Sequence, residues 1–337
     1  MYNKKQRKLI AQVLRPQNLQ KALQQVIANK GSAGIDGLKT TELKDYVQEH
    51  REGLLETVKE NKYLPQSILG VEIPKGGGKL RLLGIPTVVD RLLQQAVSQV
   101  LMPKFGNEFH ENSYGFRPYK NARTAVRKAL SNIHEGYSHI VAIDLETFFY
   151  EVDHCLLLNL IYQKVKCPVT LRLIRKWLRA PIQIKGKLVK RRKGVPQGSP
   201  LSPLLSNILL NELDKELESR KLRFARYADD FSIYCRLPSD AKLVSKAITK
   251  YLVTRLKLKV NKAKSGIVKP VRFTILGFTF ASTYQKGVKG QYQLKVGEKA
   301  WAKLKEKLKA ITRKTQPISL AERIVKINEI TRLAHLF

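Results

Sequence analysis

The stretch from Phe224 to Cys235 holds the residues best suited to chemistry, two adjacent aspartates between runs of alternating apolar residues. This pattern predicts a tight β-hairpin with Asp229 and Asp230 at or beside its turn. A solvated turn would also explain them, since Asp is common in turns. The large apolar flanks favour packed surroundings, where two carboxylates ~4 Å apart repel by ~4 kcal/mol at an effective dielectric constant near 20. We therefore expect a hard divalent cation there, Mg²⁺ being the usual one.

A third acid, Asp144, ends the β-branched and apolar run that begins at Ser138. A charge at the end of such a strand is costly unless it has a function. Three carboxylates on two adjacent strands would hold two metal ions, one activating an attacking hydroxyl and the other stabilising a leaving pyrophosphate. The acids alone thus favour nucleotidyl transfer.

The charge balance indicates a polyanionic partner. The 337 residues include 63 Lys and Arg against 27 Asp and Glu, a formal net charge of +36, more than solubility requires. Nucleic acid explains this better than a membrane, because no apolar run approaches ~18 residues and no basic amphipathic helix with an aromatic face stands out. The basic N-terminus lacks a following apolar segment, so we expect no secretory signal and an intracellular, cytoplasmic protein. Three widely spaced cysteines disfavour disulfides and a zinc site.

The periodicity of apolar residues and the placement of turn residues predict the helices and strands that must position the acids. The length of the chain allows two or three subdomains. Helices are expected within 8–60, 90–101, 155–180, 243–258 and 301–314, and again from Leu320. Strand pairs are expected at 71–86, 185–193 and around 273–278, with a helix after the glycine-proline loop at 194–203.

Two of these segments could bind a nucleotide. The hairpin at 71–86 has three glycines at its tip and bases at Lys75, Lys79 and Arg81, so it could fold over a triphosphate. An ordinary exposed hairpin in a basic protein explains it equally well. The loop at 194–203 lets backbone approach a ligand, with Gln197 at its rim, although its prolines would also suit a rigid turn.

Two further segments are candidates for contact with nucleic acid. Residues 112–118 interleave aromatic residues with Arg117 and could line a nucleic-acid track. The basic strand pair at 185–193 could touch a phosphate backbone, or could simply be solvated.

The order of motifs along nearly the whole chain resembles the group II intron-encoded reverse transcriptases and closely related bacterial enzymes. The series is Ile-Pro-Lys with a following Arg, Gly-Ile-Pro-Thr, Ser-Tyr-Gly-Phe-Arg-Pro, Asp-Leu-x-x-Phe-Phe, Pro-Gln-Gly-Ser-Pro-Leu-Ser-Pro, Tyr-Ala-Asp-Asp, Asn-x-x-Lys-Ser and Leu-Gly-Phe. Any one could arise by chance, but eight in order do not.

The resemblance implies a role for particular residues. It makes Asp144, Asp229 and Asp230 catalytic, with Leu145 beside them in the metal site. Two Mg²⁺ ions are implied, with Mn²⁺ as a substitute. The nucleotide-binding residues would be Lys75, Arg81, Phe149, Gln197 and Lys264, Phe149 screening the 2′ face of the sugar. The turn that grips the primer end would be Leu276, Gly277 and Phe278.

Two positions depart from the family pattern. The family usually has Asp after the Phe-Phe pair, where this chain has Tyr150. Family members commonly carry Gly-Trp after an Arg late in the second thumb helix, where Arg332 is followed by Leu333 and Ala334. We therefore expect a shortened chain or an unusually short member, without the full thumb, the DNA-binding region or the endonuclease domain.

The resemblance also predicts an α/β (α+β) right-hand polymerase. Its expected parts are an N-terminal extension with fingers (1–110), a first palm segment (111–154), a fingers insertion (155–195), a second palm segment on an antiparallel sheet (196–288) and the start of a helical thumb (289–337). The expected reaction adds dNTPs to a DNA or RNA primer on an RNA template. A maturase that binds structured intron RNA, and a defence-associated enzyme of the same lineage, are the alternatives.

Overall fold

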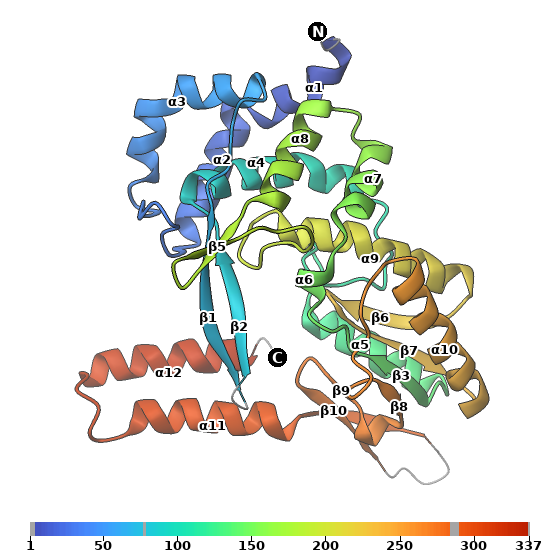
Figure 1. The fold of residues 1–337 in the computed structure, drawn as a ribbon. Coiled ribbons are helices and arrows are strands. Elements are labelled where there is room, and N and C mark those ends of the chain that lie inside the picture. Colours follow the sequence, from blue (N-terminus) through green and yellow to red (C-terminus); the bar gives the residue numbers. More distant parts are fainter. Residues whose placement is uncertain (1–3, 77–78, 284–289, 336–337) are drawn as a thin grey trace. The chain divides into compact units, whose positions relative to one another are not determined.

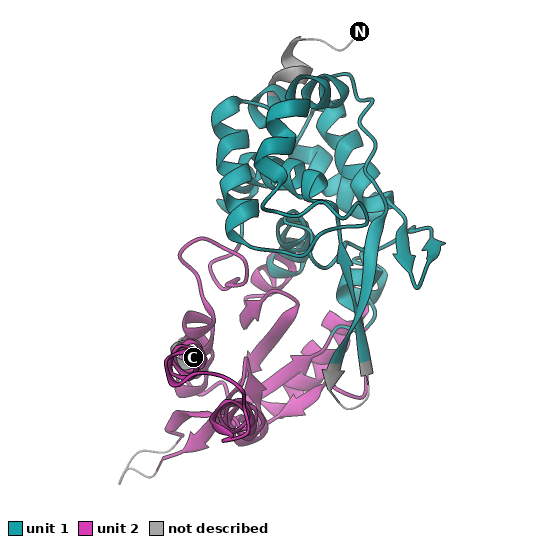
Figure 2. Ribbon diagram, turned by 90° about the vertical axis from the view of Figure 1, so that its left-hand side faces the viewer, with its two compact units in different colours: residues 1–109, 145–214, 251–259 teal, residues 110–144, 215–250, 260–337 magenta. Residues whose placement is uncertain are grey.

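The structure is a computed structural model that describes residues 4–76, 79–283 and 290–335, without the side chains of residues 4–8, 75, 76, 79 and 332–335. Helix makes up 51% and strand 18%, which confirms the expected mixed class. The chain divides into two compact units, each built from separated segments (Figure 2). Unit 1 holds residues 1–109, 145–214 and 251–259, and unit 2 holds residues 110–144, 215–250 and 260–337.

Unit 1 is mainly helical (Figure 1), as its periodicity predicted. Its central helix α4 (Val88–Gly106) is buried along most of its length and packs against α2 (Pro16–Ala28). Pro16 opens α2 with the fixed φ that suits a first helical turn. The other helices of this unit are α1 (Lys4–Val13), α3 (Leu43–Lys59), α6 (Phe148–Glu151), α7 (His154–Lys164) and α8 (Pro168–Arg179).

The sheet of unit 1 has the strand order β2-β1-β4-β5, which leaves β2 at an edge. The predicted hairpin is present as β1 (Ile68–Gly76) and β2 (Lys79–Ile85), paired antiparallel. The basic strand pair begins earlier than predicted, as β4 (Ile182–Ile184) and β5 (Lys187–Val189), with β4 parallel to β1. The shift has a packing cause, because Ile182 joins Ile68 and Ala180 in a buried cluster.

Unit 2 is built on an antiparallel sheet with the order β6-β7-β3-β8. Its strands are β6 (Arg223–Tyr227), β7 (Asp230–Cys235), β3 (His139–Ile143) and β8 (Gly266–Val268). Helix α5 (Ala122–His134) packs its small and branched face against this sheet, in a core cluster that includes Ala125, Ala129, Ile133, Ile140 and Tyr234. The antiparallel sheet expected around the acids is therefore present.

The remaining elements of unit 2 follow β8. A three-stranded sheet joins β9 (Thr274–Ile275), β10 (Phe278–Ser282) and β11 (Tyr292–Val296), after the short helix η1 (Pro270–Arg272). The basic helices α11 (Glu298–Thr312) and α12 (Leu320–His335) pack on each other. The unit boundary falls within both α9 (Ser202–Ser219) and α10 (Pro238–Thr254).

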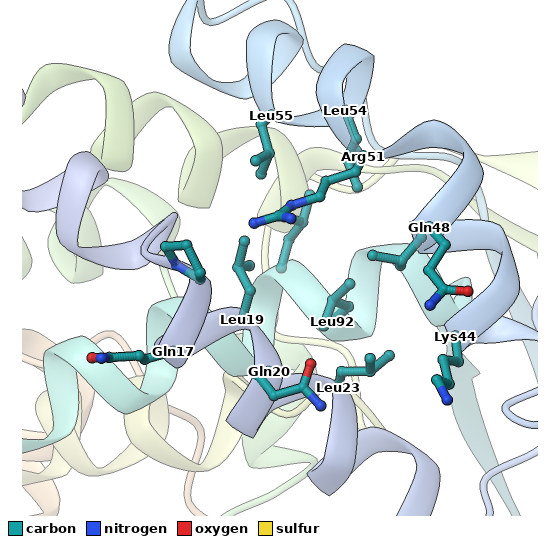
Figure 3. Close-up of a pocket in the computed structure, with 13 residues that line it drawn as sticks. Gln17, Leu19, Gln20, Leu23, Lys44, Gln48, Arg51, Leu54, Leu55 and Leu92 are labelled. Atoms are coloured by element: carbon teal, nitrogen blue, oxygen red, sulfur yellow. The ribbon is translucent and has the colours of Figure 1, made fainter.

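A cavity of about 490 Å³ lies among α2, α3 and α4 (Figure 3). Six leucines line it together with Pro16 and Val47, and its polar lining is Lys44, Arg51 and three glutamines. None of the predicted site residues lines it, so it is separate from the chemistry considered below. Elsewhere in the described chain, no helix combines the length and hydropathy needed to cross a membrane.

Candidate active site

The two adjacent aspartates lie at the end of the β6–β7 hairpin. The last pair of this hairpin is Tyr227 with Asp230, so Ala228 and Asp229 are its two turn residues. Ala228 has a φ of +56°. This left-handed conformation costs a residue with a Cβ roughly 1–2 kcal/mol. The turn must therefore be held by contacts with neighbouring side chains and backbone.

Those contacts come from Arg226 and from the segment around Ser113. Arg226 is fully buried, and its guanidinium donates to the carbonyl oxygen of Ala228 at 2.9 Å and to Ser113 Oγ at 2.7 Å. Gly115 presses on the turn, since a Cβ there would lie 2.3 Å from the backbone N of Ala228. The sequence analysis missed Arg226, although a charged residue inside an apolar strand was a usable signal.

Asp144 is brought to the same end of the sheet by strand register. It follows the Ile143–Phe231 pair of β3 and β7, which puts it opposite Asp230. The Asn-x-x-Lys-Ser motif holds its backbone: Asn261 N donates to Asp144 O at 2.9 Å, and Asp144 N donates to Ser265 Oγ at 3.0 Å. Lys264 of the same motif has its Nζ 3.8 Å from Asp144 Oδ2. The predicted meeting of Asp144 with the hairpin thus occurs within unit 2.

The electrostatics of Asp230 reflect this grouping. Partial burial, and then the negative charges of Asp229 and Asp144, raise the pKa of Asp230 to about 6. The side chain still reaches solvent on one side, so desolvation is incomplete. An acid whose pKa is raised by like charges is stabilised when a cation binds beside it.

The donor set suits a hard divalent ion, because carboxylate oxygens are the ligands that Mg²⁺ prefers. The carboxylates are not preassembled, however: among the described residues, no three His, Cys, Asp or Glu side chains are grouped closely enough to hold a metal ion. Repulsion among the three negatively charged carboxylates favours their separation, and Lys264 attracts Asp144. Leu145 is buried and apolar, so only its backbone carbonyl could act as a ligand.

The predicted primer-binding turn also lies in unit 2, between β9 and β10. Leu276 and Gly277 both have positive φ, +50° and +85°. Gly297 N donates to the carbonyl oxygen of Gly277 at 2.7 Å, which ties the turn to the start of α11. Phe278 packs in the core, but it still lines a pocket together with Leu276 and Gly277.

Unit 1 gathers three of the remaining predicted residues. Arg81 on β2 donates from Nε to Oε1 of Gln197, in the glycine-proline loop. The same loop holds Phe149 by its backbone, because Val195 N donates to Phe149 O at 2.7 Å. Lys75 belongs to β1, but its side chain lies outside the described part of the structure.

The two neighbouring phenylalanines of α6 differ in exposure. Phe148 is 2% exposed, whereas Phe149 is half-buried. Their rings meet edge to face with centroids 5.2 Å apart. Phe148 is therefore a core residue, and Phe149 remains partly accessible to solvent.

Comparison with known proteins agrees with this arrangement. The family described as reverse transcriptase (RNA-dependent DNA polymerase) matches residues 73–280, more than half of the chain. The chain belongs to this family. The match begins within β1 and includes the other strands of the unit 1 sheet, the four-stranded sheet of unit 2 and all three acids.

Individual relatives narrow the class. The group II intron-encoded protein LtrA of Lactococcus lactis is 30% identical over 92% of this chain, and this chain spans 55% of the length of LtrA. Protein YkfC of Escherichia coli is 29% identical over 77% of this chain and 79% of its own length. Telomerase from Candida albicans, solved with a fragment of telomeric RNA, has the same fold at a TM-score of 0.54 and 15% identity, over 85% of this chain and 57% of its own.

These findings show a reverse transcriptase with a polymerase fold, and its similarity to a group II intron-encoded protein agrees with the resemblance seen in the sequence. The enzyme class that this membership gives is RNA-directed DNA polymerase. A nucleic-acid partner and a general dependence on divalent metal follow from the family.

Proposed function

We propose that this chain copies RNA into DNA by adding dNTPs to the 3′ end of a primer, as a group II intron-type enzyme. The observation that carries the proposal is the strand register that sets Asp144 opposite Asp230, with Asp229 in the adjoining turn. Two Mg²⁺ ions, for which Mn²⁺ could substitute, would activate the primer hydroxyl and stabilise the leaving pyrophosphate when bound there. The ligands would be the three aspartates and the backbone carbonyl of Leu145.

The chain's own residues then have separate tasks. Arg81 and Lys75 bind the triphosphate of the incoming dNTP, Gln197 lines its pocket, and Phe149 excludes a 2′-hydroxyl. Lys264 compensates the charge of Asp144 and lies near the phosphates. The Leu276–Phe278 turn holds the primer end.

The same proposal assigns the parts of the polymerase. Residues 1–110 and 155–195 form the N-terminal extension and fingers, residues 111–154 and 196–288 the palm, and residues 289–337 the start of the thumb. The palm assignment is supported by the antiparallel sheet that bears the acids. The protein itself is proposed to lie in the bacterial cytoplasm.

The direct test is extension of a DNA primer on an RNA template with Mg²⁺, beside binding of the same protein to structured intron RNA. Extension supports the polymerase. High-affinity intron binding without extension would favour the second candidate, a maturase, for which the net charge of +36 is the supporting observation. A defence-associated enzyme would extend primers in the same way, so this assay does not separate it from an intron enzyme.

The charge itself predicts how binding depends on salt. Affinity for an RNA–DNA hybrid should fall by about 10³-fold or more between about 50 and 200 mM salt, as for a protein that makes ~6–10 phosphate contacts. Fluorescence anisotropy at several salt concentrations measures the slope. A flat response would show that the positive charge does not serve nucleic-acid binding.

A further inference from the structure

The hydroxyl of Tyr150 donates a hydrogen bond to the backbone carbonyl of Leu82. Tyr150 belongs to α6 and directly follows Phe149, whereas Leu82 belongs to β2 and directly follows Arg81. One side-chain contact therefore joins the neighbours of two residues to which we assign nucleotide binding. All four residues lie within unit 1.

The contact has a structural reason in the position of β2. Because β2 is an edge strand, every second residue directs its N–H and C=O away from β1, where no strand pairs with them. Gly84 N points outward in this way and donates to the carbonyl oxygen of Gln197 at 3.0 Å. Leu82, two residues earlier, has the same direction, and its outward carbonyl accepts from Tyr150.

The loop that receives Gly84 also touches α6. Its Val195 N donates to Phe149 O at 2.7 Å. At Gly194, whose φ is +87°, a Cβ would lie 2.8 Å from Phe149 O and 2.9 Å from the Cα of Tyr150. Strand β2, the loop at 194–198 and α6 thus form a closed set of contacts, and the Tyr150 hydroxyl is the link that runs directly from α6 to β2.

A tyrosine can make this link where an aspartate cannot. An ionised carboxylate only accepts hydrogen bonds. A carbonyl oxygen such as that of Leu82 needs a donor. The hydroxyl of Tyr150 therefore supplies a donor that a carboxylate at this position would lack.

We propose that Tyr150 is a positioning residue that fixes strand β2, and with it Arg81, relative to Phe149. The inference rests on the proposed function, since it assigns Tyr150 to the binding of the incoming dNTP. Tyr150 acts through its neighbours rather than on the reacting atoms. Loss of the hydroxyl should weaken nucleotide binding and leave the chemical step almost unchanged.

The test compares Tyr150→Phe with a control, Tyr162→Phe, which removes the hydroxyl of an exposed tyrosine on α7 of the same unit. With Tyr150→Phe, KM for the dNTP should rise about three- to tenfold, the value of one ordinary hydrogen bond, while kcat stays within about twofold. Tyr150→Asp should raise KM at least as much. The control should match the parent. An unchanged KM in Tyr150→Phe, or an equal rise of KM in Tyr150→Phe and in the control Tyr162→Phe, would overturn the proposal.

A second measurement does not need polymerase activity. Hydrogen–deuterium exchange of the free protein should show the Gly84 amide exchanging about three- to tenfold faster in Tyr150→Phe than in the parent, because the strand edge is less firmly held. If the parent does not extend primers, the proposed function fails while the exchange result still decides whether Tyr150 fastens β2. Equal exchange rates would show that it does not.

Discussion

Asp90 in unit 1 and the aspartates of unit 2 are held in opposite ways. Asp90 is 1% exposed, and Tyr63 Oη and Trp177 Nε1 each donate to its Oδ1 at 2.8 Å. Its Oδ2 accepts from Thr87 Oγ1 at 3.0 Å and from Gln66 N at 3.2 Å. Burial raises the pKa of Asp90, while these donors act in the other direction. Both carboxylate oxygens are therefore occupied by the fold.

At the unit 2 hairpin the neighbours of Asp230 are two other acids, and they add to the effect of burial on its pKa. The fold fixes the backbone of the turn through Arg226 and Gly115, while the charges of Asp229 and Asp144 oppose the ionisation of Asp230. The contrast separates two uses of an acidic side chain. An acid whose two carboxylate oxygens accept hydrogen bonds from the fold supports the structure. An acid with like charges beside it is suited to binding a cation.

The largest effect expected from this contrast is on catalysis. Asp229→Asn should reduce primer extension on the order of 10³-fold or more, because a metal ligand is lost, while RNA affinity stays nearly unchanged. Single-turnover extension and RNA binding measure the two quantities. Asp240→Asn, an exposed acid at the start of α10, is the control and should extend normally. Extension within tenfold of the parent in Asp229→Asn would sink the assignment.

The two phenylalanines of α6 offer the same kind of contrast. Phe149→Val should lower the discrimination against ribonucleotides by about 10²-fold, because the 2′-hydroxyl is no longer excluded, with little change in stability. Phe148→Ala should instead cost ~3–5 kcal/mol of stability, because it opens a cavity in the core. Paired dNTP and rNTP incorporation assays, with thermal melts, separate the two outcomes. If Phe149→Val melts like the parent and discriminates as strongly, the gate lies elsewhere.

For Asp90, the contrast predicts a loss of stability. Asp90→Asn would turn one acceptor oxygen into an amide that faces two donors, at a cost of about 1–3 kcal/mol in the free energy of unfolding. Urea denaturation followed by the fluorescence of Trp177 measures it. Glu52→Gln, an exposed acid on α3, should leave the midpoint unchanged. Equal midpoints for Asp90→Asn and the parent would mean that the hydrogen bonds around Asp90 do not support unit 1.

The smallest expected effect has the opposite sign. Without divalent ions, Asp230→Asn should stabilise the protein by about 1 kcal/mol, a value discounted for solvent screening of this accessible group. The folded pKa near 6 lies above the usual value of 3.8, so the penalty of ionising Asp230 is absent below pH 4 and grows as the pH rises to 6. The melting temperatures of the parent and of Asp230→Asn, measured from pH 4 to 8 with a chelator, should therefore converge at the acidic end. A destabilised variant at pH 7 would contradict the contrast.

Much of this architecture could be predicted from the sequence. Alternating apolar residues beside Asp229 and Asp230 predicted the hairpin, and the β-branched run before Asp144 predicted its strand partner. The motif order predicted the family. The short strands β8 and β11 escaped notice, since three to five residues carry little periodicity. The hydrogen bond between Arg226 and Ser113 joins residues 113 positions apart, and no local pattern encodes such a contact.

The register that sets Asp144 against Asp230 also constrains how the protein can be made. The sheet of unit 2 needs strands from residues 139–143, 223–235 and 266–268, and unit 1 takes its last segment from residues 251–259. Unit 1 cannot be completed before residue 259 is made, and the sheet of unit 2 cannot be completed before residue 268 is made, although the N-terminal helices meet their partners α4 and α8 earlier. Contacts of such long sequence separation form slowly and leave apolar surface exposed meanwhile. The yield of active protein should therefore depend more on the rate of translation and the supply of chaperones during synthesis than on the stability of the finished fold.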